Sequence, residues 1–349
     1  MQAQMQAWRL HAPGAPEDVL VLEDVPVPEP GLREVRVRVE AATANFNDID
    51  LLRGRYLTVN PPLPAIPGME VVGEVDAVGE GVEPEWHGRR VCAVPSGAFG
   101  GYADFACAPL AMTFEIPRSF ALPDAAALYM PFHLAWQGLH ARGHVQAGET
   151  VLVHAAAGGV GSAAVQLAKL AGARVIATAG SHDKTHLAAQ LGADVAIDYR
   201  ATDFVAAVLE ATDGLGVDVA FDTIGGDVTT QTFRCMAYGG RHLLAGFASG
   251  IEAEDEGSII PRPLLFGNFS LVGVCHSYVD DPVAVRRAAG VNFPSRAQGE
   301  TLHRELLDHV AAGRLRAVVG LDVPWSELPS ALAAMERRET VGRVVIRRW

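Results

Sequence analysis

The sequence His154-Ala-Ala-Ala-Gly-Gly-Val-Gly161 decides the fold, because a short apolar run precedes it and a stretch with helical spacing follows it. Its skeleton, Ala155-x-x-Gly158-x-x-Gly161, is a variant of the G-x-G-x-x-G turn that joins a strand to a helix around a dinucleotide. Gly158 would let the backbone approach a pyrophosphate, and Gly161 would let the helix pack closely against the strand. The alternative is a glycine-rich turn that binds no ligand. We expect a cofactor here, held by Ala155, Gly158, Gly159, Val160 and Gly161.

The two regions that flank this turn differ in pattern. Downstream, short apolar strands alternate with helical segments, which predicts βαβ units and an α/β fold with a doubly wound parallel sheet. Upstream, residues 1–125 are rich in short strands, and Glu34–Glu40 (EVRVRVE) alternates polar and apolar residues as a half-buried strand does. This upstream region is typical of a small barrel or sandwich. The strands predicted downstream cover residues 174–178, 194–197, 217–222, 241–246 and 271–274, and 342–347 forms a closing strand.

The composition is that of a globular protein with two domains. The chain has 349 residues, 49% hydrophobic and 20% charged, and one domain typically takes about 150 residues. Lys and Arg number 28 and Asp and Glu 41, so the net charge is 28 − 41 = −13. This charge disfavours binding to nucleic acid or to an anionic membrane surface. The uncharged stretch 150–168 contains glycines and polar residues, so we interpret it as strand, turn and helix rather than a membrane span.

The cysteines indicate a reducing compartment. Cys92, Cys107, Cys235 and Cys275 lie far apart in the sequence, and no pair has C-x-x-C spacing. A chain of this length needs no disulfide to fold. Residues 1–11 also lack the apolar core of a signal peptide. We therefore expect a cytoplasmic protein.

The residues after the second strand of the parallel sheet favour NADPH over NADH. NAD sites usually carry an acidic residue there, which binds the ribose 2′-hydroxyl. Here the strand ends in Thr178-Ala-Gly-Ser181, followed by Lys184, and Tyr199 and Arg200 end the next strand. Small residues with a cation suit a 2′-phosphate, although Lys184 could be an ordinary solvated residue and Asp183 lies nearby. The residues predicted to contact this end of NADPH are Gly180, Ser181, Lys184 and Tyr199.

Further motifs extend over nearly the whole chain. They are Asn45-Phe-Asn-Asp48, Leu52-Arg-Gly-Arg-Tyr56, Pro67-Gly-Met-Glu70, Gly100-Gly-Tyr-Ala103, Leu191-Gly-Ala193 and Gly342-Arg-Val-Val345. Together with the glycine turn and Lys184, they make the chain resemble the medium-chain dehydrogenase/reductase superfamily, and within it the zinc-free quinone oxidoreductase (zeta-crystallin-like) branch.

This resemblance implies a two-domain architecture. Residues 1–127, completed by 313–349, would form a GroES-like β-barrel catalytic domain, and residues 128–312 a Rossmann NADPH-binding domain. The active site would lie in the cleft between them. The resemblance also implies a homodimer joined through the nucleotide-domain sheets, near Ser270–Val274.

The resemblance also bears on metal binding. Zinc-dependent relatives use a Cys, a His and a second Cys, and the motifs assign these positions to Asn45, Met69 and Met130 of this chain. None of these side chains is a normal zinc ligand, and the sequence has no cluster of four close cysteines for a structural zinc. We therefore expect no metal. An electron-poor quinone or enone then suits hydride transfer better than a simple ketone, which needs a Lewis acid.

Histidines on the helix that follows the first domain do not change this expectation. His133, His140 and His144 are spaced i, i+7, i+11 on an apolar stretch, with no Cys or carboxylate among them. We interpret them as ordinary helix residues rather than metal ligands. Many relatives have a threonine near the nicotinamide where this chain has Leu134, so His133 beside it could instead reach the active site and act as an acid. A structural role for His133 is the alternative.

Two further residues are candidates for the reaction. Asn45 could be a hydrogen-bond donor at the nicotinamide end, as the resemblance implies, or an ordinary helix cap. Tyr56 matches a position where enoyl-thioester reductases of this superfamily keep a proton-donating tyrosine, or it is a half-buried aromatic residue. The catalytic candidates are thus Asn45, Tyr56 and His133. Residues after the last two strands of the parallel sheet would contact the nicotinamide, namely Gly246, Phe247 and Val274.

These inferences lead to one expected function and two rivals. We expect an NADPH-dependent, metal-free oxidoreductase that reduces quinones or other electron-poor enones. The first rival is an NADPH-dependent 2-enoyl-thioester or alkenal reductase. The second is a protein that binds NADPH without turnover and serves a structural or RNA-binding role, which the net charge of −13 argues against.

Overall fold

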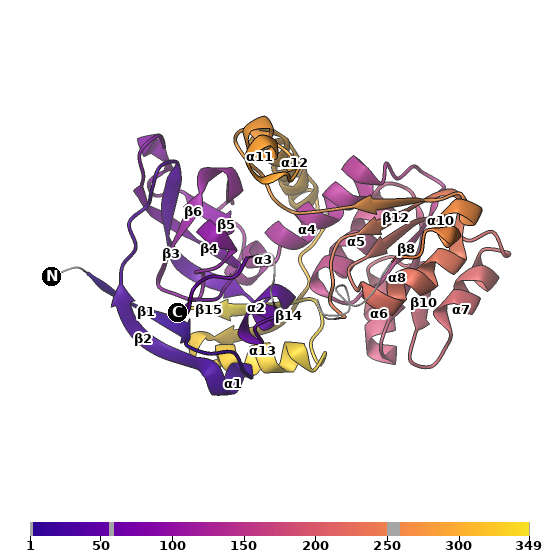
Figure 1. The fold of residues 1–349 in the computed structure, drawn as a ribbon, viewed down its shortest axis with the longest axis horizontal. Helices are drawn as coiled ribbons and strands as arrows, with labels where there is room; N and C mark the ends of the chain where they lie inside the picture. Colours follow the sequence, from indigo (N-terminus) through magenta and orange to yellow (C-terminus); the bar gives the residue numbers. More distant parts are fainter. Residues whose placement is uncertain (1–2, 56–58, 250–258, 349) are drawn as a thin grey trace. The chain divides into compact units, whose positions relative to one another are not determined.

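The computed structural model describes residues 3–55, 59–249 and 259–348 (Figure 1). The chain divides into two compact units. The first unit comprises Met1–Tyr129, Ser277–Glu305 and Ala317–Trp349, and the second comprises Met130–His276 and Leu306–Arg316. The sequence boundaries placed residues 277–305 in the nucleotide domain, whereas in the structure this segment packs with the first unit.

The second unit contains the predicted parallel sheet. Its strand order is β10-β9-β8-β11-β12-β13, and every neighbouring pair is parallel. The chain runs outward from β8 to β10 and then returns to β11 on the other side of β8. The order therefore reverses between β8 and β11, where doubly wound sheets bind their ligands. The strands are β8 Thr150–Val153, β9 Arg174–Ala179, β10 Val195–Asp198, β11 Val217–Asp222, β12 Met236–Leu244 and β13 Ser270–Gly273.

Helices connect these strands, and local sequence signals set where two of them begin. The Ser181 hydroxyl accepts the Lys184 N–H at the start of α6, and the Asp203 carboxylate accepts the Val205 N–H at the start of α7. Both are preferred N-cap residues, each typically worth about 1 kcal/mol of stability. The helices are α5 Gly159–Leu170, α6 His182–Gln190, α7 Phe204–Ala211, α8 Gly226–Thr232 and α10 Arg262–Gly267.

Apolar side chains hold the second unit together. Leu152 and Ala220 on neighbouring strands pack in one buried cluster with Phe204 and Val208 of α7. Complete burial of one large aliphatic or aromatic side chain contributes about 1.5–3 kcal/mol. The uncharged stretch 150–168 forms strand, turn and helix, as predicted. No helix in the described part of the chain is both long and apolar enough to cross a membrane.

The first unit is organised around β3, Glu34–Thr43, which pairs antiparallel with β4, β6 and β15. The predicted alternation is confirmed, because Val35 and Val37 are buried while Arg36 and Arg38 bind Asp76 and Glu74. The sheet order is β14-β15-β3-β4-β5-β7, with β6 also on β3, and β1 and β2 form a separate hairpin. The strands are β1 Gln4–Leu10, β2 Leu20–Pro26, β4 Glu70–Val78, β5 Arg90–Ala93, β6 Phe105–Pro109, β7 Thr113–Glu115, β14 Val319–Pro324 and β15 Arg343–Arg347.

Short helices complete the first unit. The boundaries between the two units fall after the first residue of α4 Tyr129–Trp136, which continues as the π-helix η4 Gln137–Arg142, and within α12 Arg296–Ala311. The other helices of the first unit are α1 Pro16–Val19, α2 Phe46–Leu52, α3 Leu122–Ala126, α11 Pro282–Ala289 and α13 Leu328–Glu336, with 3₁₀ turns at Pro84–Trp86, Ser96–Ala98, Leu110–Met112 and Trp325–Glu327. A further 3₁₀ turn, Phe233–Cys235, lies in the second unit.

Candidate functional site

The glycine turn leads from β8 into α5 at the point where the sheet order reverses. Gly158 is the N-cap of α5, and the first helical hydrogen bond runs from the Ser162 N–H to the Gly158 carbonyl at 2.9 Å. The N–H groups of Gly159, Val160 and Gly161 lie in the first helical turn, where no intrahelical acceptor exists. Together with the helix dipole, these groups form a site suited to a pyrophosphate.

Close packing explains why the last residue of the turn, Gly161, is a glycine. A Cβ atom on Gly161 would lie 2.2 Å from the Ala155 carbonyl oxygen, so no side chain fits there. A Cβ on Gly158 would lie 3.3 Å from the same oxygen, which is tight but not prohibitive. Ala155 itself has φ +51°, in the left-handed region. The turn is therefore folded directly onto the start of α5.

The structure brings together most of the residues predicted to contact the adenosine end of the cofactor. Gly180 follows β9, and a Cβ on it would lie 2.7 Å from the hydroxyl oxygen of Tyr199, which follows β10. Ser181 and Lys184 occupy the first turn of α6, with the Ser181 Oγ 3.3 Å from the Lys184 N–H. The Asp183 side chain is fully solvent-exposed, 3.7 Å from His182. No carboxylate occurs in residues 178–181 that could bind a ribose hydroxyl.

The residues predicted at the nicotinamide end also follow the carboxyl ends of parallel strands. Gly246 and Phe247 come after β12, in a loop whose Ala248 N–H donates to the Thr223 carbonyl at 3.0 Å. Val274 comes after β13 and donates its N–H to the Leu244 carbonyl at 2.8 Å. Because the strands are parallel, these loops lie along the same edge of the sheet as the glycine turn.

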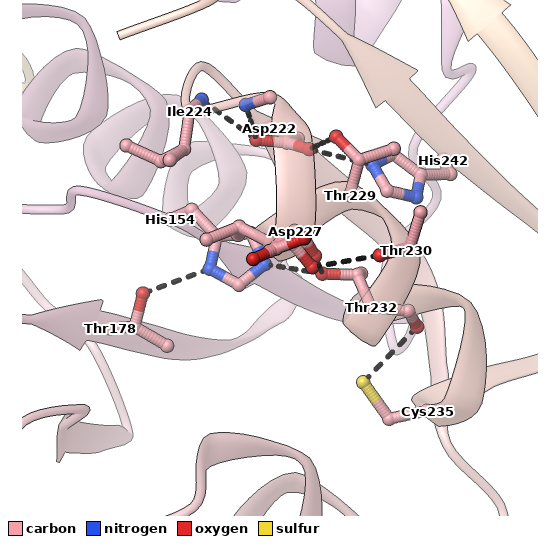
Figure 2. Close-up of polar contacts among 12 residues, drawn as sticks. His154, Thr178, Asp222, Ile224, Asp227, Thr229, Thr230, Thr232, Cys235 and His242 are labelled. Atoms are coloured by element: carbon pink, nitrogen blue, oxygen red, sulfur yellow. Dashed lines mark hydrogen bonds and ion pairs between the residues drawn. The ribbon is translucent and has the colours of Figure 1, made fainter. Parts of the chain in front are cut away.

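Sequence analysis missed a buried polar cluster behind the turn, which Figure 2 shows. The His154 ring lies between two threonines, with Nδ1 3.0 Å from the Thr178 hydroxyl and Nε2 2.9 Å from the Thr232 hydroxyl. The Thr232 hydroxyl donates its own hydrogen to the Val228 carbonyl at 2.6 Å. It therefore accepts from Nε2–H. Burial lowers the His154 pKa to about 4, so the ring is neutral near pH 7 and its Nδ1 accepts the Thr178 hydroxyl hydrogen.

Asp222 at the end of β11 is the charged member of this cluster. Its Oδ1 accepts the N–H groups of Ile224 and Gly225 at 2.8 and 3.1 Å, and its Oδ2 accepts from Thr229 at 2.5 Å and from His242 Nε2 at 3.1 Å. Burial alone would raise the pKa of Asp222, but the hydrogen bond from His242 and its other partners hold that pKa well below its usual value. The carboxylate thus stays ionised and fixes the loop after β11.

The first unit holds a second buried network around Asn45. The Arg343 guanidinium on β15 donates from Nη1 to Asn45 Oδ1 at 2.9 Å and from Nη2 to Glu70 and Thr43. Asn45 Nδ2 donates to the Thr43 carbonyl at 3.3 Å. Asn45 is the N-cap of α2, and its backbone N–H is accepted by Asp48 at 2.9 Å. The network fixes the Asn45 amide orientation, with its oxygen facing a cation.

Asp48 is completely buried beside this network. It accepts the Gly68 N–H and the Tyr102 hydroxyl, each at 2.9 Å, as well as the Asn45 N–H. Burial raises its pKa to about 6, although the hydrogen bonds from Tyr102 and the two N–H groups oppose the increase. Asp48 therefore links the start of α2 to the segment that precedes β4.

Comparison with known proteins identifies the family. The family described as "Zinc-binding dehydrogenase" matches residues 159–286, and the "Alcohol dehydrogenase GroES-like domain" matches residues 31–118. The "Quinone oxidoreductase-like protein 2 homolog" of Nematostella vectensis is 35% identical over 325 residues, which cover 90% of this chain and 82% of that protein. The chain belongs to the medium-chain dehydrogenase/reductase superfamily, in its quinone-oxidoreductase-like branch.

Two further relatives extend this result within the superfamily. The "2-haloacrylate reductase" of a Burkholderia species is 32% identical and covers 97% of each chain. A mycobacterial protein solved in complex with NADPH has a TM-score of 0.83 and 31% identity, and the alignment covers 98% of this chain and 99% of that one. This medium-chain dehydrogenase/reductase is accordingly an oxidoreductase that uses a nicotinamide cofactor and a small-molecule substrate.

Of the other two catalytic candidates, the structure describes His133. His133 on α4 is buried, and its ring lies edge-on to that of His276, with 5.7 Å between centroids. Burial lowers the pKa of His276, which follows β13, to about 4. Tyr56 lies outside the described residues. Within the described ranges, no group of three His, Cys, Asp or Glu side chains is arranged to hold a metal ion.

The neutral His154 predicts a pH-dependent stability. A pKa that falls from 6.5 when unfolded to about 4 when folded means that the unfolded chain takes up the proton first. The contribution of His154 to the free energy of unfolding is therefore complete above pH 6.5. As the pH falls toward 4, the free energy of unfolding decreases by about 3 kcal/mol on account of this residue. Urea unfolding at several pH values between 4.5 and 7.5 should show this decrease, and the variant His154→Gln should show a smaller one. Equal slopes for the two proteins would contradict the assignment.

Proposed function

We propose that this protein is an NADPH-dependent oxidoreductase that reduces quinones or other electron-poor enones without a metal ion. The observation that carries the proposal is the glycine turn at the sheet reversal, combined with a β9 end that has no carboxylate. When bound, NADPH supplies a hydride from its nicotinamide ring. The protein contributes the phosphate site of α5, the loops that orient the cofactor, and hydrogen-bond donors for the substrate oxygen.

The geometry after β9 supports NADPH as the cofactor. Gly180 and Tyr199 pack against each other, and Ser181 opens α6 with a neutral side chain. Neutral, small residues leave room for a 2′-phosphate, and Lys184 adds positive charge in the first turn of α6. Gly246, Phe247 and Val274 are proposed to contact the nicotinamide half from the loops after β12 and β13. An NADH-specific site would place a carboxylate where Gly180 and Ser181 stand.

The network in the first unit supports a donor role for Asn45. Its amide oxygen accepts from Arg343 and one amide hydrogen is donated to the Thr43 carbonyl, so the second amide hydrogen is the proposed donor to the substrate. A hydrogen bond from an amide fixed in this way can stabilise negative charge on a reduced substrate oxygen. The side chains of Asn45, Met69 and Met130 offer no set of zinc ligands, which supports chemistry without a Lewis-acid metal. Electron-poor acceptors need less polarisation, and this fits quinones and enones.

A second candidate substrate class is an activated alkene, such as a 2-enoyl thioester or an alkenal. The similarity to a 2-haloacrylate reductase favours it, because that relative's name specifies an activated carbon–carbon double bond. Reduction of such a bond requires a proton for the carbon next to the activating group. Tyr56 is the proposed donor in that case. His133 is a second proposed acid.

The proposed assembly is a homodimer joined along β13. This strand ends the six-stranded sheet, and its only sheet neighbour in the described chain is β12. Its open side therefore has backbone groups available for pairing with a second copy. The proposed domain assignment keeps the nucleotide site within residues 128–312.

A substitution at Ser181 tests the cofactor. Asp and Asn cap helices about as well as Ser, so both variants should keep α6 intact. Ser181→Asp places a carboxylate near the proposed 2′-phosphate, and we expect the ratio of kcat/KM for NADPH to that for NADH to fall about tenfold or more. Ser181→Asn, which adds no charge, is the matched control. An unchanged ratio in Ser181→Asp, or equal use of both cofactors by the unmodified protein, would overturn the choice of NADPH.

A comparison of substrates tests the reaction class. NADPH oxidation is measured at saturating cofactor with chelator-treated protein, on a quinone and on a short 2-enoyl thioester in parallel. We expect turnover of the quinone that survives the chelator. Faster turnover of the thioester, with a kcat that falls in Tyr56→Phe, would instead establish the alkene reductase. Loss of all activity on chelation, restored by zinc, would refute metal-free chemistry.

The role of Asn45 is tested by an isosteric change. Asn45→Asp keeps an oxygen facing Arg343 but removes the amide donor. Loss of one donor to a developing oxyanion typically lowers kcat by about 100-fold or more. We expect a decrease of this size with an unchanged KM for NADPH. A kcat within about twofold of the unmodified protein would show that Asn45 serves only as a helix cap.

A further inference from the structure

The turn that follows β8 contains a residue in an unfavourable backbone conformation. Ala155 has φ +51°, a region that non-glycine residues adopt at a cost of about 1 kcal/mol or more. Such a residue persists only where its surroundings hold it in place. Two neighbouring backbone bonds contribute, from the Ala156 N–H to the Thr178 carbonyl at 3.0 Å and from the Gly158 N–H to the Ala155 carbonyl at 2.8 Å. The conformation matters because the Ala155 carbonyl lies against Gly161.

The side chain of His154 anchors the other side of this residue. Thr178 binds the turn twice, through its carbonyl to the Ala156 N–H and through its hydroxyl to the His154 ring. The opposite ring nitrogen reaches Thr232 at the end of α8, as Figure 2 shows. The ring thus connects β8 to β9 on one side and to the helix after β11 on the other. These are the elements on both sides of the point where the sheet order reverses.

The charged groups around His154 do not compete for its hydrogen bonds. Asp222 and His242 are the titratable groups that influence it, and the Phe204 ring lies edge-on at 5.1 Å. Both Asp222 oxygens are engaged by Ile224, Gly225, Thr229 and His242. His154 is therefore held by neutral threonine hydroxyls in a fixed tautomer. This arrangement sets the direction of the ring at both nitrogen atoms.

We infer that His154 is a positioning residue for the nicotinamide cofactor, because its ring holds Ala155 in the left-handed conformation that shapes the phosphate site at α5. The inference rests on the proposed function only in that the turn binds the cofactor pyrophosphate. His154 has no contact with the reacting atoms in this account. Its loss should weaken cofactor binding while the rate of the chemical step at saturating cofactor stays nearly the same.

The first experiment compares two substitutions at this position. His154→Phe keeps a ring but removes both hydrogen bonds, and we expect the Kd for NADPH to rise about tenfold, with kcat within about twofold. His154→Gln retains a donor and an acceptor and should restore part of the affinity. The Kd is measured by calorimetry on the full chain. His303→Gln is the matched control, since His303 is also buried but binds the Glu115 carbonyl in the first unit.

The second experiment asks whether His154 acts through Ala155. Glycine adopts positive φ without penalty, so Ala155→Gly makes the turn less dependent on its anchor. We expect His154→Phe to weaken NADPH binding less in the Ala155→Gly background than in the unmodified protein. Hydrogen exchange of the amides of residues 156–161 in the cofactor-free protein gives an independent readout. These amides should exchange faster in His154→Phe and not in His303→Gln.

The outcomes separate this inference from the proposed cofactor. An unchanged Kd in folded His154→Phe, a kcat that falls as much as the affinity, or additive effects of His154→Phe and Ala155→Gly would each overturn it. Every Kd is measured with NADPH and with NADH. A protein that prefers NADH but loses affinity for it in His154→Phe would refute the choice of NADPH and still support the role of His154.

Discussion

The contact between the Ala155 carbonyl oxygen and Gly161 is the constraint on which the nucleotide unit depends. A Cβ would come within 2.2 Å of that oxygen, so the strand can meet the helix this closely only through glycine. Because only residues 154–158 separate β8 from α5, the unpaired N–H groups at the start of the helix lie at the edge of the sheet where the order of strands reverses. The fold and the phosphate site are thus consequences of one steric condition.

Buried polar groups hold the segments that carry the candidate residues within each unit. In the second unit an ionised Asp222 fixes the loop after β11, while a neutral His154 fixes the turn after β8. In the first unit Arg343, which is paired with Glu70, holds Asn45. Buried charges are costly unless they are paired, so such residues persist where they fix a geometry. The candidate site accordingly depends on side chains that do not themselves meet the substrate.

Local patterns in the sequence predicted the elements with a clear period or turn. The alternation in Glu34–Glu40 predicted β3, and the glycine turn predicted β8 and α5. Helix α11 was not assigned, because residues 280–300 are rich in Pro, Arg and Ala. The pair Asp281-Pro282 could have predicted the start of this helix, because Asp is a preferred N-cap and Pro is common at the first helical position. In the structure the Asp281 carboxylate accepts the Ala284 N–H at 2.9 Å.

The polar networks could not be predicted because their members lie far apart in the chain. Arg343 is 298 residues from Asn45, and His154 is 78 residues from Thr232. Within short apolar strands, residues such as Asp222 and His242 carry no local signal that identifies their partners. Only the pairing of strands brings them together. Sequence motifs therefore located the turn and the helix cap, but not the side chains that orient them.

The position of β15 has a consequence for the order of synthesis. This strand is made after every other strand of its sheet, yet it pairs with Ala41–Thr43 of β3 and carries the arginine that pairs with Glu70. On the ribosome, the interior of the first sheet therefore stays incomplete until residues 343–347 emerge. The sheet of the second unit, in contrast, uses only residues 150–273 and is synthesised before then. The parallel sheet can therefore assemble while the sheet of the first unit still lacks its strand β15.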